Sequence, residues 1–121
     1  MSKQTVVPQL RMTDAAKAMA FYIDQLGFTV DWQHQFEPGF PLFLQLTRGG
    51  QTIFLSGHAG DCAPGGAVYF WVPDADATYA ALTAKGVTPV KPIEDMPWGV
   101  REFLLVDPDH NKLRFGTELN P

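Results

Sequence analysis

Apolar and polar residues alternate along several short stretches of the chain, as they do in strands that are buried on one face. Residues 100–106 are the clearest case, with Glu102 on one face and Arg101 and Phe103 on the other. Pro92 restricts the stretch in which it lies to the edge of a sheet, because proline cannot donate a backbone hydrogen bond. The predicted strands cover residues 4–12, 28–35, 42–47, 51–56, 67–72, 87–92, 100–106 and 112–117.

Two other stretches carry apolar residues at helical spacing, and they begin near residues 15 and 75. Each follows a residue whose side chain can accept a hydrogen bond from the first helical turn, and each ends at a glycine. We therefore predict two helices with similar boundaries. The capping residue is Thr13 or Asp14 in the first helix and Asp74 or Asp76 in the second, and the terminating glycines are Gly27 and Gly86.

The predicted elements repeat in the order strand, helix, strand, hairpin, and the Gly49-Gly50 pair joins the first hairpin. This order predicts an α+β fold made of two βαβββ modules, over about residues 4–57 and 66–118, with curled mixed sheets. A unit of about 60 residues buries little apolar surface by itself. Each module should therefore pack on the other within one domain of 121 residues, or on a partner subunit.

Composition narrows the class of protein. A net charge of −4 argues against a nucleic-acid partner, which would select a basic surface. Cys62 is the only cysteine, so no disulfide can form within the chain. Met1–Thr5 has no basic apolar leader, and no apolar run is long enough to span a membrane. We expect a cytoplasmic protein.

The glycine-rich segment 57–66 contains the one cluster of metal-ligating side chain types, which is His58, Asp61 and Cys62. Three interpretations remain open: a metal site, a loop in which the aspartate binds its own backbone, or the polar rim of a ligand pocket. Ser56 and Cys62 have no partners in the order that a nucleophilic site requires.

Aromatic residues are the more informative feature of the chain, which has nine Phe, three Tyr and three Trp. Trp32 shares the predicted apolar face of residues 28–35 with Val30 and His34. Trp98 lies between Pro97 and Gly99, at a corner where core packing does not require the largest side chain. We therefore predict that Trp98 stacks on a flat ligand.

Several motifs of the chain occur together in one known family. The segments are 7–10 (Val-Pro-Gln-Leu), 20–28 (Ala-Phe-Tyr-Ile-Asp-Gln-Leu-Gly-Phe), 53–56 (Ile-Phe-Leu-Ser), 71–72 (Trp-Val), 97–103 (Pro-Trp-Gly-Val-Arg-Glu-Phe) and 107–111 (Asp-Pro-Asp-His-Asn). With these segments the chain resembles the glyoxalase/bleomycin resistance/extradiol dioxygenase superfamily over about residues 6–118. Within it, the chain is most similar to the bleomycin resistance proteins.

The resemblance also bears on catalysis. Enzymes of the superfamily hold a divalent metal with one His, Gln or Glu from each of the first, fourth, fifth and eighth strands. The motifs place these positions at Val7, about Phe54, Ala67 and Arg114, which are not such ligands. Gln9 and Gln45 would point inward only if the register slipped by one residue. The resemblance therefore implies the fold with no metal, no cofactor and no catalytic residues.

What the resemblance implies about function is binding without reaction. We expect a homodimer that sequesters a bleomycin-type antibiotic or a similar planar cationic molecule, with the modules paired within one chain or by exchange between two chains. A metal-dependent lyase or isomerase of the same superfamily is the alternative, and a sensor module is a third. The ligand-binding residues expected are Trp32, Phe36, Phe40, Phe54, Ser56, His58, Asp61, Trp71, Trp98, Gly99, Arg101 and Phe103.

Overall fold

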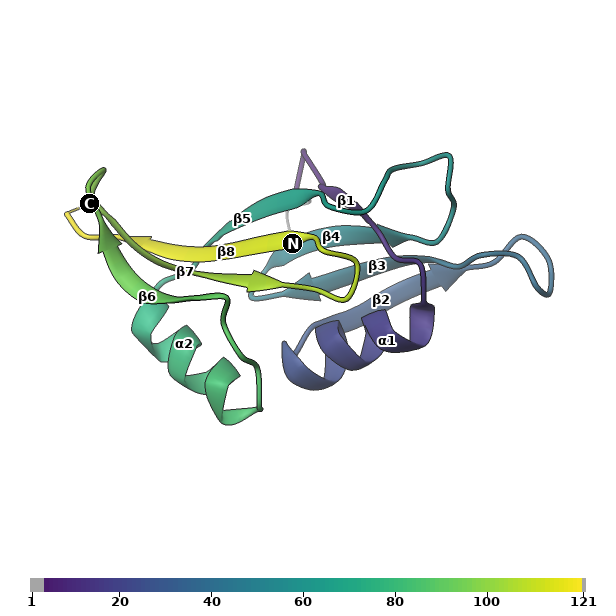
Figure 1. The fold of residues 1–121 in the computed structure, drawn as a ribbon. Coiled ribbons are helices and arrows are strands. Elements are labelled where there is room, and N and C mark those ends of the chain that lie inside the picture. Colours follow the sequence, from purple (N-terminus) through teal and green to yellow (C-terminus); the bar gives the residue numbers. More distant parts are fainter. Residues whose placement is uncertain (1–3, 121) are drawn as a thin grey trace.

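The computed structural model describes residues 4–120, so most of the Met1–Thr5 segment lies outside the described residues. It contains two four-stranded sheets, with strand orders β1-β4-β3-β2 and β5-β8-β7-β6 (Figure 1). This arrangement confirms the predicted α+β fold of two βαβββ modules. The elements are β1 (Gln9–Arg11), α1 (Ala15–Met19), η1 (Ala20–Gln25), β2 (Thr29–His34), β3 (Phe43–Arg48), β4 (Gln51–Ser56), β5 (Ala67–Trp71), α2 (Ala75–Ala84), β6 (Lys91–Met96), β7 (Val100–Val106) and β8 (Lys112–Glu118).

Aspartates cap the first turns of both helical segments. Asp14 Oδ1 accepts a hydrogen bond from the Lys17 backbone N–H at 3.1 Å, and Asp74 Oδ1 accepts one from the Ala77 N–H at 3.2 Å. Each carboxylate satisfies an N–H group that has no partner within its helix. Of the alternatives that the sequence allowed, Asp14 and Asp74 are the caps.

The first helical segment differs from the single α-helix that its periodicity predicts. After α1 the backbone widens into the π-helix η1, where the Leu26 N–H donates to Phe21 O at 2.9 Å. The segment ends at Gly27, whose φ of 81° suits a residue without a Cβ. Within η1 the side chain of Tyr22 is completely buried, and it reaches the C-terminal module.

A bulge in β2 changes which of its side chains share a face. Val30 pairs with Leu46, but Trp32 pairs with Gln45, so Asp31 is an extra residue between them. Because Leu46 faces the helix and Gln45 faces away from it, Val30 and Trp32 lie on opposite sides of the sheet. The predicted apolar face that joined Val30 to Trp32 is therefore wrong.

Two predicted strands have other boundaries in the structure. The segment expected at 4–12 is a strand only at Gln9–Arg11, because the Gln4 side chain amide, rather than the backbone, bonds both the N–H and the C=O of Thr52. The segment expected at 87–92 becomes β6 at Lys91–Met96. As predicted, the strand that contains Pro92 lies at a sheet edge.

The turn between β7 and β8 connects the two modules. Asp107 Oδ2 accepts hydrogen bonds from the Tyr22 hydroxyl at 2.6 Å and from Asn111 Nδ2 at 2.9 Å. Asn111 Nδ2 also donates to Arg11 O at 2.9 Å, and the backbone N–H of Thr13 donates to Asp109 Oδ2 at 3.1 Å. This turn therefore fixes the position of the N-terminal module on the C-terminal one.

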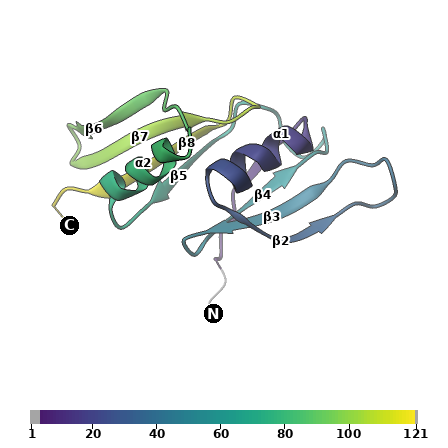
Figure 2. The same cartoon turned by 90° about the horizontal axis from the view of Figure 1, so that it is seen from below.

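Both helices lie on the same side of the sheets (Figures 1 and 2). The buried side chains form one core that continues from module to module, for example through Phe28 and Phe70, whose ring centroids are 6.0 Å apart. Helices cover only one face of each sheet, and no helix covers the other face within residues 4–120. Within residues 4–120, no helix has the length and apolar character needed to cross a lipid bilayer.

Candidate ligand-binding site

The face of the N-terminal sheet that is turned away from the helix carries aromatic and polar side chains. Leu44 and Leu55 are fully buried on the helix side, so their neighbours along β3 and β4 point the other way. We call this surface the N-terminal open face. It consists of Trp32, Phe43, Gln45, Thr47, Thr52 and Phe54.

Three rings group on the N-terminal open face. Trp32 stacks on Phe43 with ring centroids 5.8 Å apart and an interplanar angle of 14°, and Phe54 lies 5.1 Å from Phe43. Trp32 and Phe43 border an open pocket of about 520 Å³. The residues that line this N-terminal pocket are Trp32, His34, Phe36, Phe43, His58 and Asp61.

The polar wall of the N-terminal pocket is held in place by hydrogen bonds. The Ser56 hydroxyl donates to Asp61 Oδ2 at 2.5 Å and accepts from the His58 backbone N–H at 3.1 Å. Among residues 4–120, the one buried side-chain nitrogen or oxygen without a hydrogen-bond partner is His58 Nε2. The Asp61 carboxylate thus bonds the Ser56 side chain rather than the backbone of its own loop, and it also borders the pocket.

Cys62 is not among the residues that line the pocket. Burial raises the pKa of its thiol, with a further contribution from the neighbouring charge of Asp61. A raised pKa keeps the thiol protonated, and a protonated thiol is a poor nucleophile and a poor metal ligand. No group of three or more His, Cys, Asp or Glu side chains within residues 4–120 is placed to hold a metal ion.

The C-terminal sheet has an open face of its own, and its central charged residue is Glu102. Only 4% of Glu102 is exposed. Its carboxylate accepts a hydrogen bond from the Tyr69 hydroxyl at 3.0 Å and forms an ion pair with Arg114 Nε at 3.4 Å. Burial and the bond to Glu102 raise the pKa of Tyr69 to about 12, so this hydroxyl remains a donor at neutral pH.

Gly116 makes room for this arrangement. A Cβ at Gly116 would lie 2.0 Å from the Tyr69 hydroxyl oxygen, far inside van der Waals contact. With no side chain at Gly116, the Tyr69 ring lies across β8, where its centroid is 4.9 Å from that of Trp71. We call the surface made by Tyr69, Trp71, Glu102, Arg114 and Glu118 the C-terminal open face.

A second pocket, of about 400 Å³, adjoins the turn between β6 and β7. At this turn the Gly99 N–H donates to Met96 O at 3.0 Å, and Gly99 has a φ of 90°. Trp98 therefore projects from the tip of a hairpin and is 69% exposed, in agreement with the predicted corner. The lining of this C-terminal pocket is Trp71, Trp98, Gly99, Val100, Glu118 and Asn120.

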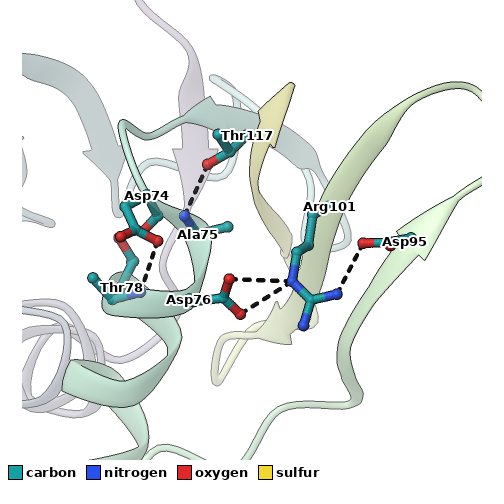
Figure 3. Close-up of polar contacts among 8 residues, drawn as sticks. Asp74, Ala75, Asp76, Thr78, Asp95, Arg101 and Thr117 are labelled. Atoms are coloured by element: carbon teal, nitrogen blue, oxygen red, sulfur yellow. Dashed lines mark hydrogen bonds and ion pairs between the residues drawn. The ribbon is translucent and has the colours of Figure 1, made fainter. Parts of the chain in front are cut away.

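Two residues expected to bind a ligand point the other way, toward α2. Figure 3 shows Arg101 between two carboxylates, with Nε 3.0 Å from Asp76 Oδ1 and Nη1 2.8 Å from Asp95 Oδ1. Phe103 is 1% exposed and stacks on Phe115 in the core. Strand alternation sends both side chains to the helix side, so neither of them lines the N-terminal or the C-terminal pocket.

The structure brings together four of the remaining residues in the N-terminal pocket (Trp32, Phe36, His58 and Asp61) and three in the C-terminal pocket (Trp71, Trp98 and Gly99). Phe54 contacts Trp32, with centroids 6.0 Å apart, and Ser56 is fully buried beneath Asp61. Phe40 lines neither pocket. Its backbone oxygen accepts a hydrogen bond from Gln35 Nε2 at 2.7 Å.

The positions at which related enzymes hold a metal do not suit a divalent ion. Gln9, Phe54 and Gln45 pair across three strands and lie in one row, so Gln9 takes the place that the sequence gave to Val7. Arg114 in the other sheet brings a positive charge. Two amides beside a phenyl ring in one sheet and a guanidinium in the other do not form the N/O set that such ions require.

Comparison with known proteins identifies the family. A family model described as "Glyoxalase superfamily protein" matches residues 1–121. The chain belongs to the glyoxalase superfamily. The bleomycin resistance protein of Geobacillus stearothermophilus is 25% identical to this glyoxalase-superfamily chain over 129 residues, which cover 93% of the chain and 96% of that protein.

Solved structures agree with this assignment. The crystal structure of TioX from Micromonospora sp. ML1 has a TM-score of 0.77 and 27% identity, and the match covers 97% of this chain and 100% of TioX. A bleomycin-binding protein crystallised with bleomycin has a TM-score of 0.74 and 23% identity, with 96% and 99% of the chains covered. At 23% identity, the likeness to the bleomycin-binding protein shows the shared fold alone.

Sequence reasoning missed several residues of the two pockets. His34 and Phe43 line the N-terminal pocket, and Glu118 lines the C-terminal one. Tyr69 and Gly116 shape the C-terminal open face. For Tyr69 the available signal was Gly116, since a glycine inside a predicted strand often marks the close approach of another group.

Proposed function

We propose that this glyoxalase-superfamily protein binds and sequesters a planar, cationic antibiotic of the bleomycin type without altering it. The observation that carries the proposal is the N-terminal pocket, in which Trp32, Phe36 and Phe43 border a space of about 520 Å³ beside Asp61. Flat rings and a carboxylate are complementary to a flat cationic molecule. Similarity to a bleomycin resistance protein, at 25% identity, supports the same function.

The proposal includes a homodimer. Trp32 and Trp71, on the N-terminal and C-terminal open faces, are 45% and 51% exposed, and helices cover only the opposite sides of the sheets. Exposed aromatic surfaces of this kind bind partners or ligands. If the N-terminal open face of one chain covers the C-terminal open face of another, the ligand lies in the crevice between them. Sedimentation equilibrium measures this directly, and a mass of one chain at micromolar concentration would refute the dimer.

Titration with bleomycin tests the binding proposal. Tryptophan emission should change saturably in the unmodified protein, since Trp32 lines the N-terminal pocket. Trp32→Ala should weaken binding about tenfold, because a buried stacking contact and its area are lost. Trp98→Ala, with Trp32 still present as a reporter, measures the contribution of the C-terminal pocket. Emission that stays unchanged at saturating drug would remove bleomycin as the ligand.

The alternative lyase or isomerase function makes a separate prediction. An enzyme of that kind requires a stoichiometric divalent ion, and EDTA should abolish its activity. Metal analysis of protein purified without chelator distinguishes the two functions. The sequestering protein should bind the drug equally well before and after EDTA treatment, and the drug recovered from it should be chemically intact.

A further inference from the structure

The C-terminal pocket combines two indole rings with a carboxylate. Trp71 and Trp98 are both more than half exposed, and both line the pocket with Glu118. Among residues 4–120, Glu118 forms no ion pair. The pocket, of about 400 Å³, therefore offers π faces and one negative charge to whatever enters it.

The strand register shows that this end of the C-terminal open face is acidic. Glu94 lies directly opposite Glu102, and Glu118 is opposite Val100 in the neighbouring row. Cross-strand partners point to the same side of a sheet, so the three carboxylates share one face, and like charges directly opposite each other are destabilising. Arg114 is paired with Glu102, at 3.4 Å, and within residues 4–120 the other two carboxylates form no ion pair.

We propose that the C-terminal pocket binds an organic ammonium group, held by the rings of Trp71 and Trp98 and by the carboxylate of Glu118. The inference rests on the proposed function and deepens it. It assigns the cationic part of the ligand to this pocket and the planar part to the N-terminal pocket around Trp32. Glu118, which lies outside the family motifs, then determines the preference of this pocket for a cation over a neutral group.

An alkylated ammonium fits this pocket better than an inorganic cation or a neutral group. Indole faces attract a cation through the ring quadrupole, and the attraction is strongest for cations that lose their water easily. An inorganic divalent ion would instead require several oxygen or nitrogen ligands in close geometry. Glu118 and Asn120 are the only lining side chains that offer such oxygens within residues 4–120.

Choline and 3,3-dimethylbutan-1-ol test the proposal, because the two molecules have nearly the same shape and differ in charge. Their binding is measured by the line broadening of the methyl protons in NMR titrations of the full chain, which needs no tryptophan as a reporter. Choline should bind at least about fivefold more tightly than the neutral alcohol. Glu118→Gln and Trp71→Leu should each reduce that preference about threefold or more.

Asp24→Asn is the matched control, since Asp24 is an exposed carboxylate on η1 and its loss changes the net charge by the same amount. This variant should keep the preference for choline. Equal binding of choline and the neutral alcohol would overturn the inference, and so would equal losses in the Glu118→Gln and Asp24→Asn proteins. Thermal melting of each variant shows whether the fold is intact.

The bleomycin titration separates the two proposals. If bleomycin binds and choline shows no preference, the C-terminal pocket is not an ammonium site and the sequestering function stands. If choline is preferred through Glu118 and bleomycin does not bind, the ammonium site stands and the drug is the wrong ligand.

Discussion

Gly116 shows how a single residue determines the surface of a sheet. The Tyr69 hydroxyl occupies the space above it, and this position allows the hydroxyl to donate to the buried carboxylate of Glu102. Any side chain at Gly116 would displace the ring and leave Glu102 with only Arg114 as its partner. A buried carboxylate that loses a donor is costly.

We predict that Gly116→Ala lowers the free energy of unfolding by about 1–3 kcal/mol, through the overpacking against Tyr69 and the lost hydrogen bond. In a Tyr69→Ala background the same substitution should cost much less, because the clashing atoms are absent. The measurement is a double-mutant cycle by urea unfolding. An equal cost of Gly116→Ala in both backgrounds would show that the tyrosine does not occupy this space.

At the level of the secondary-structure element, Arg101 connects α2 to the β6–β7 hairpin. It binds Asp76 of the helix and Asp95 of β6 with separate nitrogens (Figure 3). The two carboxylates raise the pKa of the guanidinium, so it stays charged at every accessible pH. The charge on Arg101 therefore stabilises the position of the helix on the sheet and faces away from both pockets.

We predict that Arg101→Gln lowers the melting temperature and makes it less sensitive to salt, because exposed ion pairs are screened by salt. Bleomycin binding should be unchanged. Lys17→Gln, which removes an equal charge from α1, should leave the salt dependence as it is in the unmodified protein. A loss of drug affinity in the Arg101 variant, with the fold intact, would show that Arg101 contacts the ligand.

Some elements could be predicted from sequence because their determinants are local. The β3–β4 hairpin follows from Gly49 and Gly50, whose φ angles of 56° and 78° both suit a turn that disfavours other residues. The bulge at Asp31 leaves no such local mark, since inserting one residue into a strand does not disturb the alternation on either side of it. A one-residue error of this kind moved Val30 and Trp32 onto the same face in the prediction.

The candidate site was predictable to a similar extent. Trp32, Phe36, His58 and Asp61 come from segments already suspected of binding, and the structure brings them to one pocket. Gln9 was misplaced because its orientation depends on pairing with Phe54, which is 45 residues away in sequence. Long-range register of this kind is decided by tertiary packing, and local patterns do not contain it.

For the molecule as a whole, Asp107 is central to the hydrogen bonds between the modules. It accepts the Tyr22 hydroxyl from the N-terminal module and three N–H groups of its own turn. Burial and the negative charge of Asp107 raise the pKa of Tyr22 far above its ordinary value of 10.0. The folded state therefore holds this proton more tightly than the unfolded state does.

We predict that Asp107→Asn lowers the free energy of unfolding by at least about 2 kcal/mol, since it weakens several charge-assisted hydrogen bonds. Tyr22→Phe, which removes only the bond between modules, should cost about 1–2 kcal/mol. Both values come from urea unfolding at neutral pH. If Tyr22→Phe were as stable as the unmodified protein, the bond would not hold the modules together.

The dependence on pH has a definite sign. The pKa of Tyr22 is higher in the folded state than in the unfolded state. Its protonated hydroxyl therefore contributes fully to the free energy of unfolding below pH 10, and this contribution decreases as the pH rises further. The stability of the unmodified protein should therefore fall above pH 10, and that of Tyr22→Phe should fall less steeply. Tyr69, whose pKa is about 12, adds a decline between pH 10 and 12 that both proteins share.

The turn that joins the modules also shows how the two halves of the repeat differ. In the first module the corresponding hairpin turn is Gly49-Gly50, which has no side chains to offer, whereas in the second it is the segment 107–111. The two turns are consequently not interchangeable. A chain that carried the first turn in place of the second would leave Tyr22 and Thr13 without their acceptors, so each half is built to fit the other.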